Sequence, residues 1–134
     1  MEILGLGIDI IDIRRIKKNI NNKKFISRIF TTNEIKNNKN KNKEMHYAKR
    51  YAAKEAFSKA LGTGFRNSLN FNDISVINDK YGKPSIKINK KLKNIINKKF
   101  KIKKVNVFLS ISDEKDHSIA FVVLGKKWIL KKIF

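Results

Sequence analysis

The feature that most constrains the fold is an alanine-rich amphipathic segment over residues 44–61. Apolar residues recur there at helical spacing, and Gly62 stands where a helix would end. We therefore predict one long helix. Because most of its apolar positions are alanine, this helix can approach a strand or a second subunit closely. The apolar stripe consists of Met45, Ala48, Ala52, Ala56 and Ala60.

Shorter patterns fill the rest of the chain. Residues 3–11 indicate a buried strand containing two glycines, and Asp12 can cap a short helix that begins at Ile13. Thr31 and Glu34 have the spacing of a capping box, which would start another short helix. We expect further helices at residues 24–30 and 90–100, and further strands at residues 71–78, 85–88, 105–112 and 118–125.

The element order predicted from these patterns is β-α-α-α-β-β-α-β-β. This order favours an α+β fold in which helices cover one face of a largely antiparallel sheet. A length of 134 residues suits a single domain. We expect residues 1–134 to form that domain, with a loop at 36–43 and a basic, apolar tail at 126–134. The tail can pack on its own core or on a neighbour.

The charge balance asks for an anionic partner. The chain has 32 Lys and Arg against 11 Asp and Glu, a formal charge of +21. Nucleic acid, an anionic membrane, an acidic protein or a phosphorylated small molecule would fit. The lysines are spread over every connecting segment without interleaved aromatics, which argues against nucleic acid and is typical of an AT-rich genome. The apolar runs are far shorter than the ~20 residues of a membrane span.

Other classes of site and signal are also excluded. The chain has no cysteine, so we expect no disulfide, thiolate metal site or cysteine nucleophile. Met1 leads almost directly into the first strand, so we expect no signal segment.

Carboxylates embedded in apolar segments stand out in so basic a chain. Asp9 lies between two isoleucines in the first predicted strand, and Glu55 and Lys59 share a helix face. Taken singly, Asp9 could be a loop cap, and the helix pair an ordinary salt bridge. Two oxygen ligands beside a Gly62–Gly64 turn, however, suit a Mg²⁺ ion and a diphosphate.

Four motifs in order are similar to those of one enzyme family. Residues 7–16, 28–34, 53–64 and 109–112 resemble the holo-[acyl-carrier-protein] synthases, the small bacterial-type 4′-phosphopantetheinyl transferases. The resemblance implies Mg²⁺-dependent transfer of phosphopantetheine from coenzyme A to a serine of apo acyl carrier protein, which is strongly acidic. Adenosine 3′,5′-bisphosphate would be released, and the reaction would support fatty acid biosynthesis. It also implies a homotrimer with active sites at subunit interfaces.

The family's functional positions carry over residue by residue. Asp9 and Glu55 match the Mg²⁺ ligands, and Lys59 matches the lysine beside the diphosphate. We favour an electrostatic role for Lys59, with Glu55 as a rival general base. Arg14 and Arg15 match the carrier-docking helix, and Arg28 is an addition to it. The resemblance places the coenzyme, besides Lys59, at Arg50, Gly62, Thr63, Gly64, Lys83 and Pro84.

The chain departs from the family pattern at Asp113, where a histidine is usual. His117 follows four residues later and has two open roles: it could replace that histidine in space, or be an exposed hairpin residue. A carboxylate at this position would repel a nucleotide phosphate unless it turns away. We therefore predict weaker coenzyme A binding than in a relative with the histidine, and tighter binding in Asp113→His.

Three other functions remain to be weighed against the transferase. A nucleic-acid-binding module would bind with a steep salt dependence and would not need Asp9 or Glu55. A metal-dependent nucleotide hydrolase would use the same carboxylates with water in place of serine. An inactive family member would fit the missing histidine. The compartment is cytoplasmic by default, or a plastid if a transit peptide has been removed.

Overall fold

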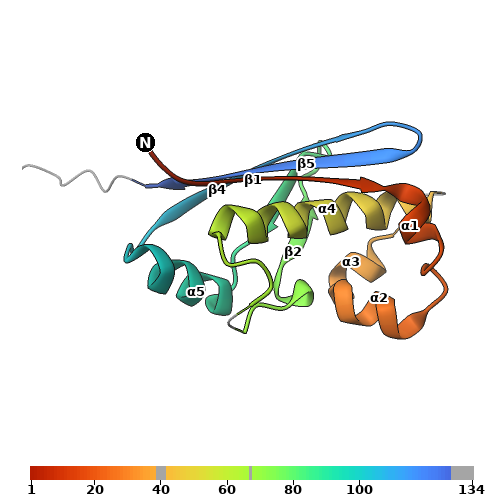
Figure 1. Cartoon of the computed structure of the whole chain (residues 1–134), viewed down its shortest axis with the longest axis horizontal. Coiled ribbons are helices and arrows are strands. Elements are labelled where there is room, and N and C mark those ends of the chain that lie inside the picture. The colour runs from red at the N-terminus through yellow and green to blue at the C-terminus, as the bar shows by residue number, and fades with distance from the viewer. Residues whose placement is uncertain (39–41, 67, 128–134) are drawn as a thin grey trace, which may run out of the picture.

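The computed structural model describes residues 1–38, 42–66 and 68–127. Strands β1 (Glu2–Asp12), β4 (Val105–Asp113) and β5 (His117–Lys126) form an antiparallel sheet in the order β1-β5-β4. The long helix α4 (Lys43–Leu61) lies along one face of this sheet, against β1 and β5 (Figure 1). The α+β fold with antiparallel strands packed on helices is confirmed.

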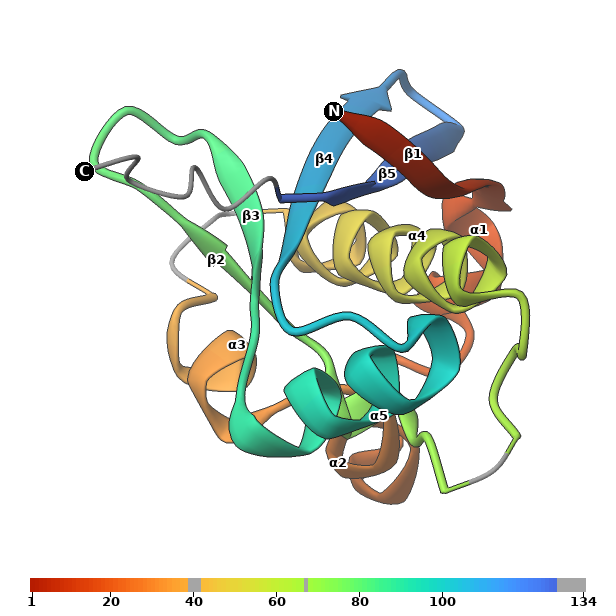
Figure 2. The same cartoon turned by 90° about the vertical axis from the view of Figure 1, so that its left-hand side faces the viewer.

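The remaining elements surround α4 on the side away from the sheet. Helices α2 (Lys23–Ile29), α3 (Thr32–Lys36) and α5 (Lys90–Phe100) lie below α4, and α1 (Ile13–Lys17) joins β1 to them (Figure 2). Strands β2 (Ser75–Asn78) and β3 (Pro84–Lys87) form a separate antiparallel hairpin beside β4. Within the described residues, no helix is long and apolar enough to cross a membrane.

Two glycines allow β1 to lie directly on the backbone of α4. A Cβ atom added at Gly7 would overlap the carbonyl oxygen of Ala56 and stand 2.7 Å from the amide nitrogen of Ala60. One added at Gly5 would overlap the carbonyl oxygen of Ala60. The alanines on the helix are fully buried or nearly so. The predicted close approach of a strand to the alanine stripe is therefore present, and it fixes β1 against α4.

The sheet has one buried and one exposed face, and both are apolar. The inner face packs on α4 through the fully buried Ala120, Val122 and Leu124 of β5. The outer face exposes large side chains from all three strands, each 38–59% accessible. These residues, which we call the outer apolar face, are Ile3, Leu6, Ile8, Ile10, Phe108, Ile119 and Phe121.

A buried ion pair holds the small helices against α4. The Lys54 ammonium, with a fully buried side chain, lies 2.5 Å from the Glu34 carboxylate and donates to the Ile29 carbonyl at 2.7 Å. Glu34 also accepts from the backbone amides of Thr31 and Val76. Burial lowers the pKa of Lys54, and the charge of Glu34 opposes that shift. Lys54 therefore connects α2, α3 and β2 to the helix that carries Glu55.

We expect Lys54→Met to destabilise the fold by about 3 kcal/mol, because it leaves the Glu34 carboxylate buried without its cation. The double variant Lys54→Met/Glu34→Gln removes both charges and should recover part of the loss. Chemical denaturation of the three proteins measures both effects. A single variant as stable as the wild type would show that the pair contributes nothing.

Most predicted elements are confirmed with their end signals. Asp12 caps α1, Thr31 and Glu34 form the capping box of α3, and Gly62 ends α4 with a φ of 79°. The predicted element order is wrong in one respect: among the described residues, four α-helices, not three, lie between the first two strands. The predicted tail at 126–134 lies outside the described residues from 128 onward.

The predicted strand at 71–78 is wrong in its first part. The Asp73 carboxylate accepts a hydrogen bond from the Asn70 amide at 2.8 Å, which closes a 3₁₀ turn, η1 (Phe71–Asp73). Strand β2 begins only at Ser75. A short acidic side chain that accepts a hydrogen bond from a nearby backbone amide competes with the pairing of that segment in a β-sheet.

Candidate active site

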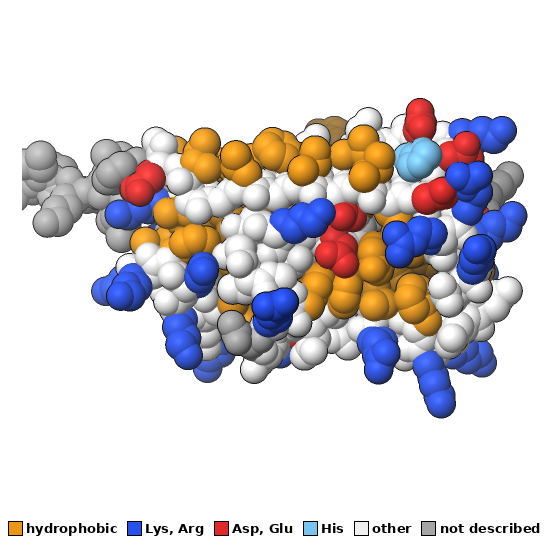
Figure 3. All heavy atoms as spheres, viewed as in Figure 1, with side chains coloured by type: hydrophobic (Ala, Val, Ile, Leu, Met, Phe, Trp, Pro, Cys, Tyr) orange, Lys and Arg blue, Asp and Glu red, His pale blue; other side chains and the backbone are white. Residues whose placement is uncertain are grey.

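The structure brings Asp9, Glu55 and Lys59 together where β1 crosses α4. The Lys59 ammonium lies 3.1 Å from Asp9 Oδ1 and donates to the Ile8 carbonyl at 2.9 Å. Glu55 stands one turn earlier on the same face of α4. Figure 3 shows this acidic group at the centre of one side of the molecule, with basic side chains on either side of it.

The two carboxylates share a partly desolvated site and repel each other. Burial is the main cause that raises the pKa of Asp9, and the hydrogen bond and charge of Lys59 oppose it. Burial also raises the pKa of Glu55, and the negative charge of Asp9 raises it further. Two carboxylates that each disfavour ionisation form a site that a cation would stabilise.

Arg15 and Tyr51 border the acidic pair. The charge of Arg15 lowers the pKa of both Asp9 and Glu55, so its guanidinium lies near them. Tyr51 opposes the raised pKa of Glu55, and its ring stacks on Phe71 with centroids 5.3 Å apart. Burial, followed by the charge of Glu55, raises the pKa of the Tyr51 phenol. The phenol therefore stays protonated and can orient the carboxylate.

The glycine turn after α4 provides open space more than free amides. The amides of Gly62 and Gly64 both donate to carbonyls of the last turn, including that of Ser58. Neither glycine has any atom within 4 Å of where a Cβ would stand. Both have positive φ, of 79° and 60°. Both amides are thus bonded within the helix end, and Thr63 between them is the polar side chain of the turn.

A second cluster of predicted residues lies at the opposite edge of the sheet. Arg50 and Pro84 line a pocket of about 120 Å³ together with Asp113. The Arg50 guanidinium donates to Asn78 Oδ1 at 2.9 Å and to the His46 carbonyl at 3.0 Å. The neighbouring Lys83 is exposed.

The two clusters do not meet within one chain. β1 and β4 are opposite edges of the sheet, and Asp9 lies on one and Asp113 on the other. Arg50 points roughly 140° away from Glu55 around α4. The structure thus divides the predicted coenzyme residues into two groups. The metal-side group lies with the predicted metal ligands Asp9 and Glu55 and consists of Lys59, Gly62, Thr63 and Gly64. The β4-edge group consists of Arg50, Lys83 and Pro84.

The predicted docking arginines differ in their surroundings. Arg14 binds the Asp12 carboxylate through two nitrogens, at 2.9 and 2.7 Å, and holds the pKa of Asp12 down to about 2. Arg15 faces the acidic pair, and Arg28 is exposed on α2. All three lie on α1 and α2, at the end of the molecule next to Asp9.

His117 does not replace the missing histidine. Its Nδ1 atom lies 3.3 Å from Glu114 Oε1, and the ring lines a hollow with Ile10, Ile119 and Asp113 that does not include Arg50 or Pro84. The exposed hairpin role is therefore the one the structure supports.

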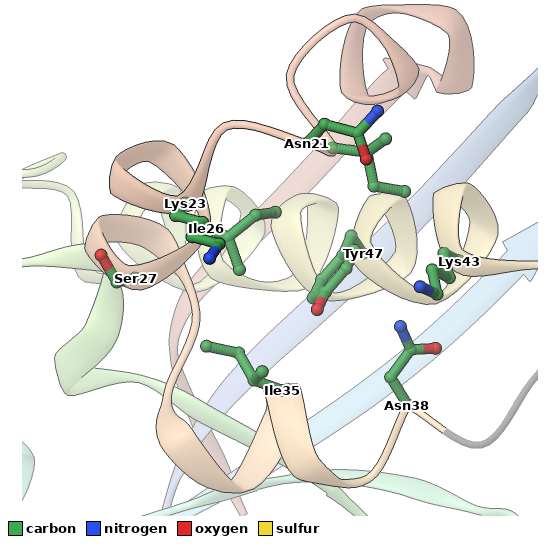
Figure 4. Close-up of a pocket in the computed structure, with 9 residues that line it drawn as sticks. Asn21, Lys23, Ile26, Ser27, Ile35, Asn38, Lys43 and Tyr47 are labelled. Carbon is green, nitrogen blue, oxygen red and sulfur yellow. The ribbon is translucent and has the colours of Figure 1, made fainter.

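A further hollow of about 300 Å³ lies between α2, α3 and the first turn of α4 (Figure 4). Ile26, Ile35 and Tyr47 point into it, and Lys23 and Lys43 stand at its border. None of the predicted catalytic or coenzyme residues lines it.

Sequence reasoning missed three residues that matter here. Lys54 is seven positions from the buried Tyr47 and from the buried Leu61, so helical spacing could have placed it in the core. Tyr51 is four positions before Glu55, on the same face. Lys49 meets Asp113 at 3.4 Å, and because they are far apart in sequence, no local pattern could have shown it.

Comparison with known proteins identifies the class. Residues 5–122 match the family model of the 4′-phosphopantetheinyl transferase superfamily. This chain belongs to that superfamily. The predicted enzyme class is therefore confirmed.

The relatives within the superfamily are holo-[acyl-carrier-protein] synthases. That of Pelagibacter ubique is 57% identical over 128 residues, covering 95% of this chain and 100% of the relative. The crystal structure of that from Bacillus anthracis, in complex with CoA (3′,5′-ADP), is 39% identical with a TM-score of 0.77 and covers 95% of this chain and 100% of the other. That from Helicobacter pylori, in complex with coenzyme A, is 34% identical with a TM-score of 0.76, covering 90% and 99%.

Proposed function

We propose that this chain transfers 4′-phosphopantetheine from coenzyme A to a serine of an apo acyl carrier protein, with Mg²⁺, in fatty acid biosynthesis. Adenosine 3′,5′-bisphosphate is the second product. The observation that carries the proposal is the convergence of Asp9, Glu55 and Lys59 at the contact between β1 and α4. The names of the relatives and the coenzyme in two of their structures support the substrates.

Asp9 and Glu55 fit a Mg²⁺ ion. Magnesium commonly takes one or two carboxylates and fills its remaining positions with waters and substrate phosphates. Within residues 1–38, 42–66 and 68–127, no group of three acidic, histidine or cysteine side chains could hold a metal. A two-carboxylate site that leaves room for a diphosphate is consistent with that. When bound there, Mg²⁺ would offset the charge of the diphosphate.

The chain's own residues would position the reactants. Lys59 pairs with Asp9 and can turn to the leaving phosphate, where its charge would stabilise the charge that develops. Glu55, oriented by Tyr51, lies where it could accept the proton of the incoming serine. Arg15 beside the pair adds a positive charge to the side from which an acidic carrier would approach.

Arg14, Arg15 and Arg28 are proposed as the docking surface for that carrier. They lie on the two helices next to the metal-side group, so a carrier bound there presents its serine close to Asp9. With a formal charge of +21 on this chain, an acidic partner is attracted from a distance. We propose no nucleic-acid partner, because the lysines are spread over every connecting segment of the sequence instead of being clustered on one element.

The coenzyme site is proposed to lie between subunits. The metal-side group and the β4-edge group are on opposite edges of one sheet, so one chain offers two different halves of a site. Halves at opposite edges match a head-to-tail interface, and such an interface forms a ring where the rotation between subunits closes. A homotrimer would pair Asp9 and Glu55 of one subunit with Arg50, Lys83 and Pro84 of the next.

The outer apolar face supports this assembly. It extends over all three strands, and exposed apolar surface of that extent marks an interaction site. Figure 3 shows the hydrophobic row along the upper edge of the molecule, above the acidic group. Assembly through this face would bury it.

We expect Phe121→Glu to prevent assembly, because Phe121 pairs across the outer apolar face with Ile8 and Ser110. The wild type should elute as three chains of 15.6 kDa each, and the variant as one, in light scattering after size exclusion. The variant should keep its circular dichroism and lose transferase activity. Tyr81→Glu, an exposed aromatic residue on the β2–β3 turn, serves as the control and should stay assembled. A trimeric, active Phe121→Glu protein would contradict the proposed interface.

The reaction itself is tested by mass spectrometry. An apo acyl carrier protein incubated with this chain, coenzyme A and Mg²⁺ should gain one phosphopantetheine. The gain should disappear after chelation and return when Mg²⁺ is restored. Release of adenosine 3′,5′-bisphosphate without a modified carrier would show a hydrolase instead. We place the activity in the cytoplasm by default, and in one domain formed by residues 1–134.

A further inference from the structure

The β4-edge pocket combines two cations and one carboxylate from separate elements. Lys49 and Arg50 come from α4, Asp113 from the end of β4, and Asn78 from β2. Arg50 is held at both terminal nitrogens, but its buried Nε atom has no partner among the described residues. A buried donor without a partner could donate to an anion that enters the pocket.

Lys49 is already paired. Its ammonium lies 3.4 Å from Asp113 Oδ1, and each side chain is about one-third exposed, at 35% and 33%. A long, partly solvated pair of this kind is weak and can exchange partners. A phosphate monoester carries up to two negative charges and three acceptor oxygens, so it competes strongly for an ammonium and a guanidinium.

Asp113 acts against such a phosphate in two ways. It neutralises Lys49, and its own charge repels the incoming anion. A nucleotide without that phosphate does not need Lys49 as a partner, and Asp113 does not weaken its binding. The pocket therefore distinguishes the two nucleotides less well than its two cations would alone.

We propose that Asp113 is a specificity-determining residue, whose carboxylate competes with the 3′-phosphate of coenzyme A for Lys49 and weakens the preference for the phosphorylated nucleotide. The proposal rests on the proposed function, which places the nucleotide end of the coenzyme at Arg50 and Pro84. It adds the role of the Lys49–Asp113 pair.

Calorimetry with two nucleotides tests the competition without turnover. Asp113→Asn should tighten binding of adenosine 3′,5′-bisphosphate roughly fivefold, because it frees Lys49 and removes the repulsion. Binding of adenosine 5′-monophosphate should not change. Lys49→Met should weaken binding of adenosine 3′,5′-bisphosphate, because the Asp113 carboxylate is then unpaired and repels the phosphate. Glu114→Gln removes the same charge one residue away, outside this pocket, and should change neither.

Kinetics with the assembled enzyme provide the second measurement. Asp113→Asn should lower the KM for coenzyme A and leave both kcat and the KM for dephospho-coenzyme A unchanged. The proposal would be overturned if Asp113→Asn bound both nucleotides more tightly to the same extent, or if it did not bind adenosine 3′,5′-bisphosphate more tightly. If the wild type transfers from neither coenzyme, the proposed function fails, while the calorimetry still decides the role of Asp113.

Discussion

Glu55→Gln is expected to reduce the transferase rate by about a hundredfold to a thousandfold, the cost of losing one main stabilising group in an active site. The substitution keeps the shape of the side chain and removes the charge that would hold Mg²⁺ beside Asp9. The rate is measured as phosphopantetheine gained by the carrier at saturating coenzyme A.

The same variant should be as stable as the wild type or more stable. Burial and the charge of Asp9 raise the pKa of Glu55 above that of an unfolded glutamate, so its ionised form weakens the fold above the unfolded pKa. Glutamine removes that penalty at neutral pH. Activity lost with thermal stability kept separates a functional residue from a structural one.

Glu44→Gln is the matched control, because it removes the same charge from the first turn of the same helix. It should retain nearly full activity. A Glu55→Gln enzyme that turns over at more than a tenth of the wild-type rate would exclude Glu55 as a metal ligand.

Gly7→Ala is expected to cost at least about 4 kcal/mol of folding stability, more than a usual overpacked core position. The added methyl group meets the backbone of α4, at Ala56 and Ala60, and a backbone cannot turn aside as a side chain can. Chemical denaturation measures the loss. Whatever protein remains folded should have little activity, because β1 must move away from α4 and carry Asp9 away from Glu55.

Gly125→Ala on the neighbouring strand β5 is the control. The three atoms nearest to a Cβ there all belong to the side chain of Met1, which can move. Its stability should change by about 1 kcal/mol or less. If Gly7→Ala proves equally mild, β1 and α4 are not held together by backbone contact.

Sequence patterns predicted the elements that end in a local signal. Asp12, Thr31 and Gly62 act through hydrogen bonds or dihedral angles within a few residues, so their effect is visible in the sequence. The strand at 71–78 failed because the bond from Asn70 to Asp73 is a local alternative that strand propensity ignores. A local sequence pattern predicts structure well where the residues have only one favourable local conformation.

The sequence pointed to candidate site residues but said less about how they are arranged. Asp9 and Glu55 stood out as carboxylates in apolar segments, and they do lie together. The separation of Arg50 from Glu55 follows from the angle between them on α4 and could have been derived. The contact of Lys49 with Asp113 joins α4 to β4 and depends on how the sheet packs, which no spacing in the sequence contains.

The alternation of side chains along β1 leaves this strand little freedom to change in length. One side of this 11-residue strand carries Gly5, Gly7 and Asp9 against α4, and the other carries Leu6, Ile8 and Ile10 to the outer face. An inserted or deleted residue would exchange the two sides at once. Isoleucines would then meet the helix backbone, and Asp9 would point away from Glu55. Evolution can therefore substitute side chains of β1 one at a time, but it cannot insert or delete a residue between Gly5 and Ile10 without exchanging the two faces of the strand.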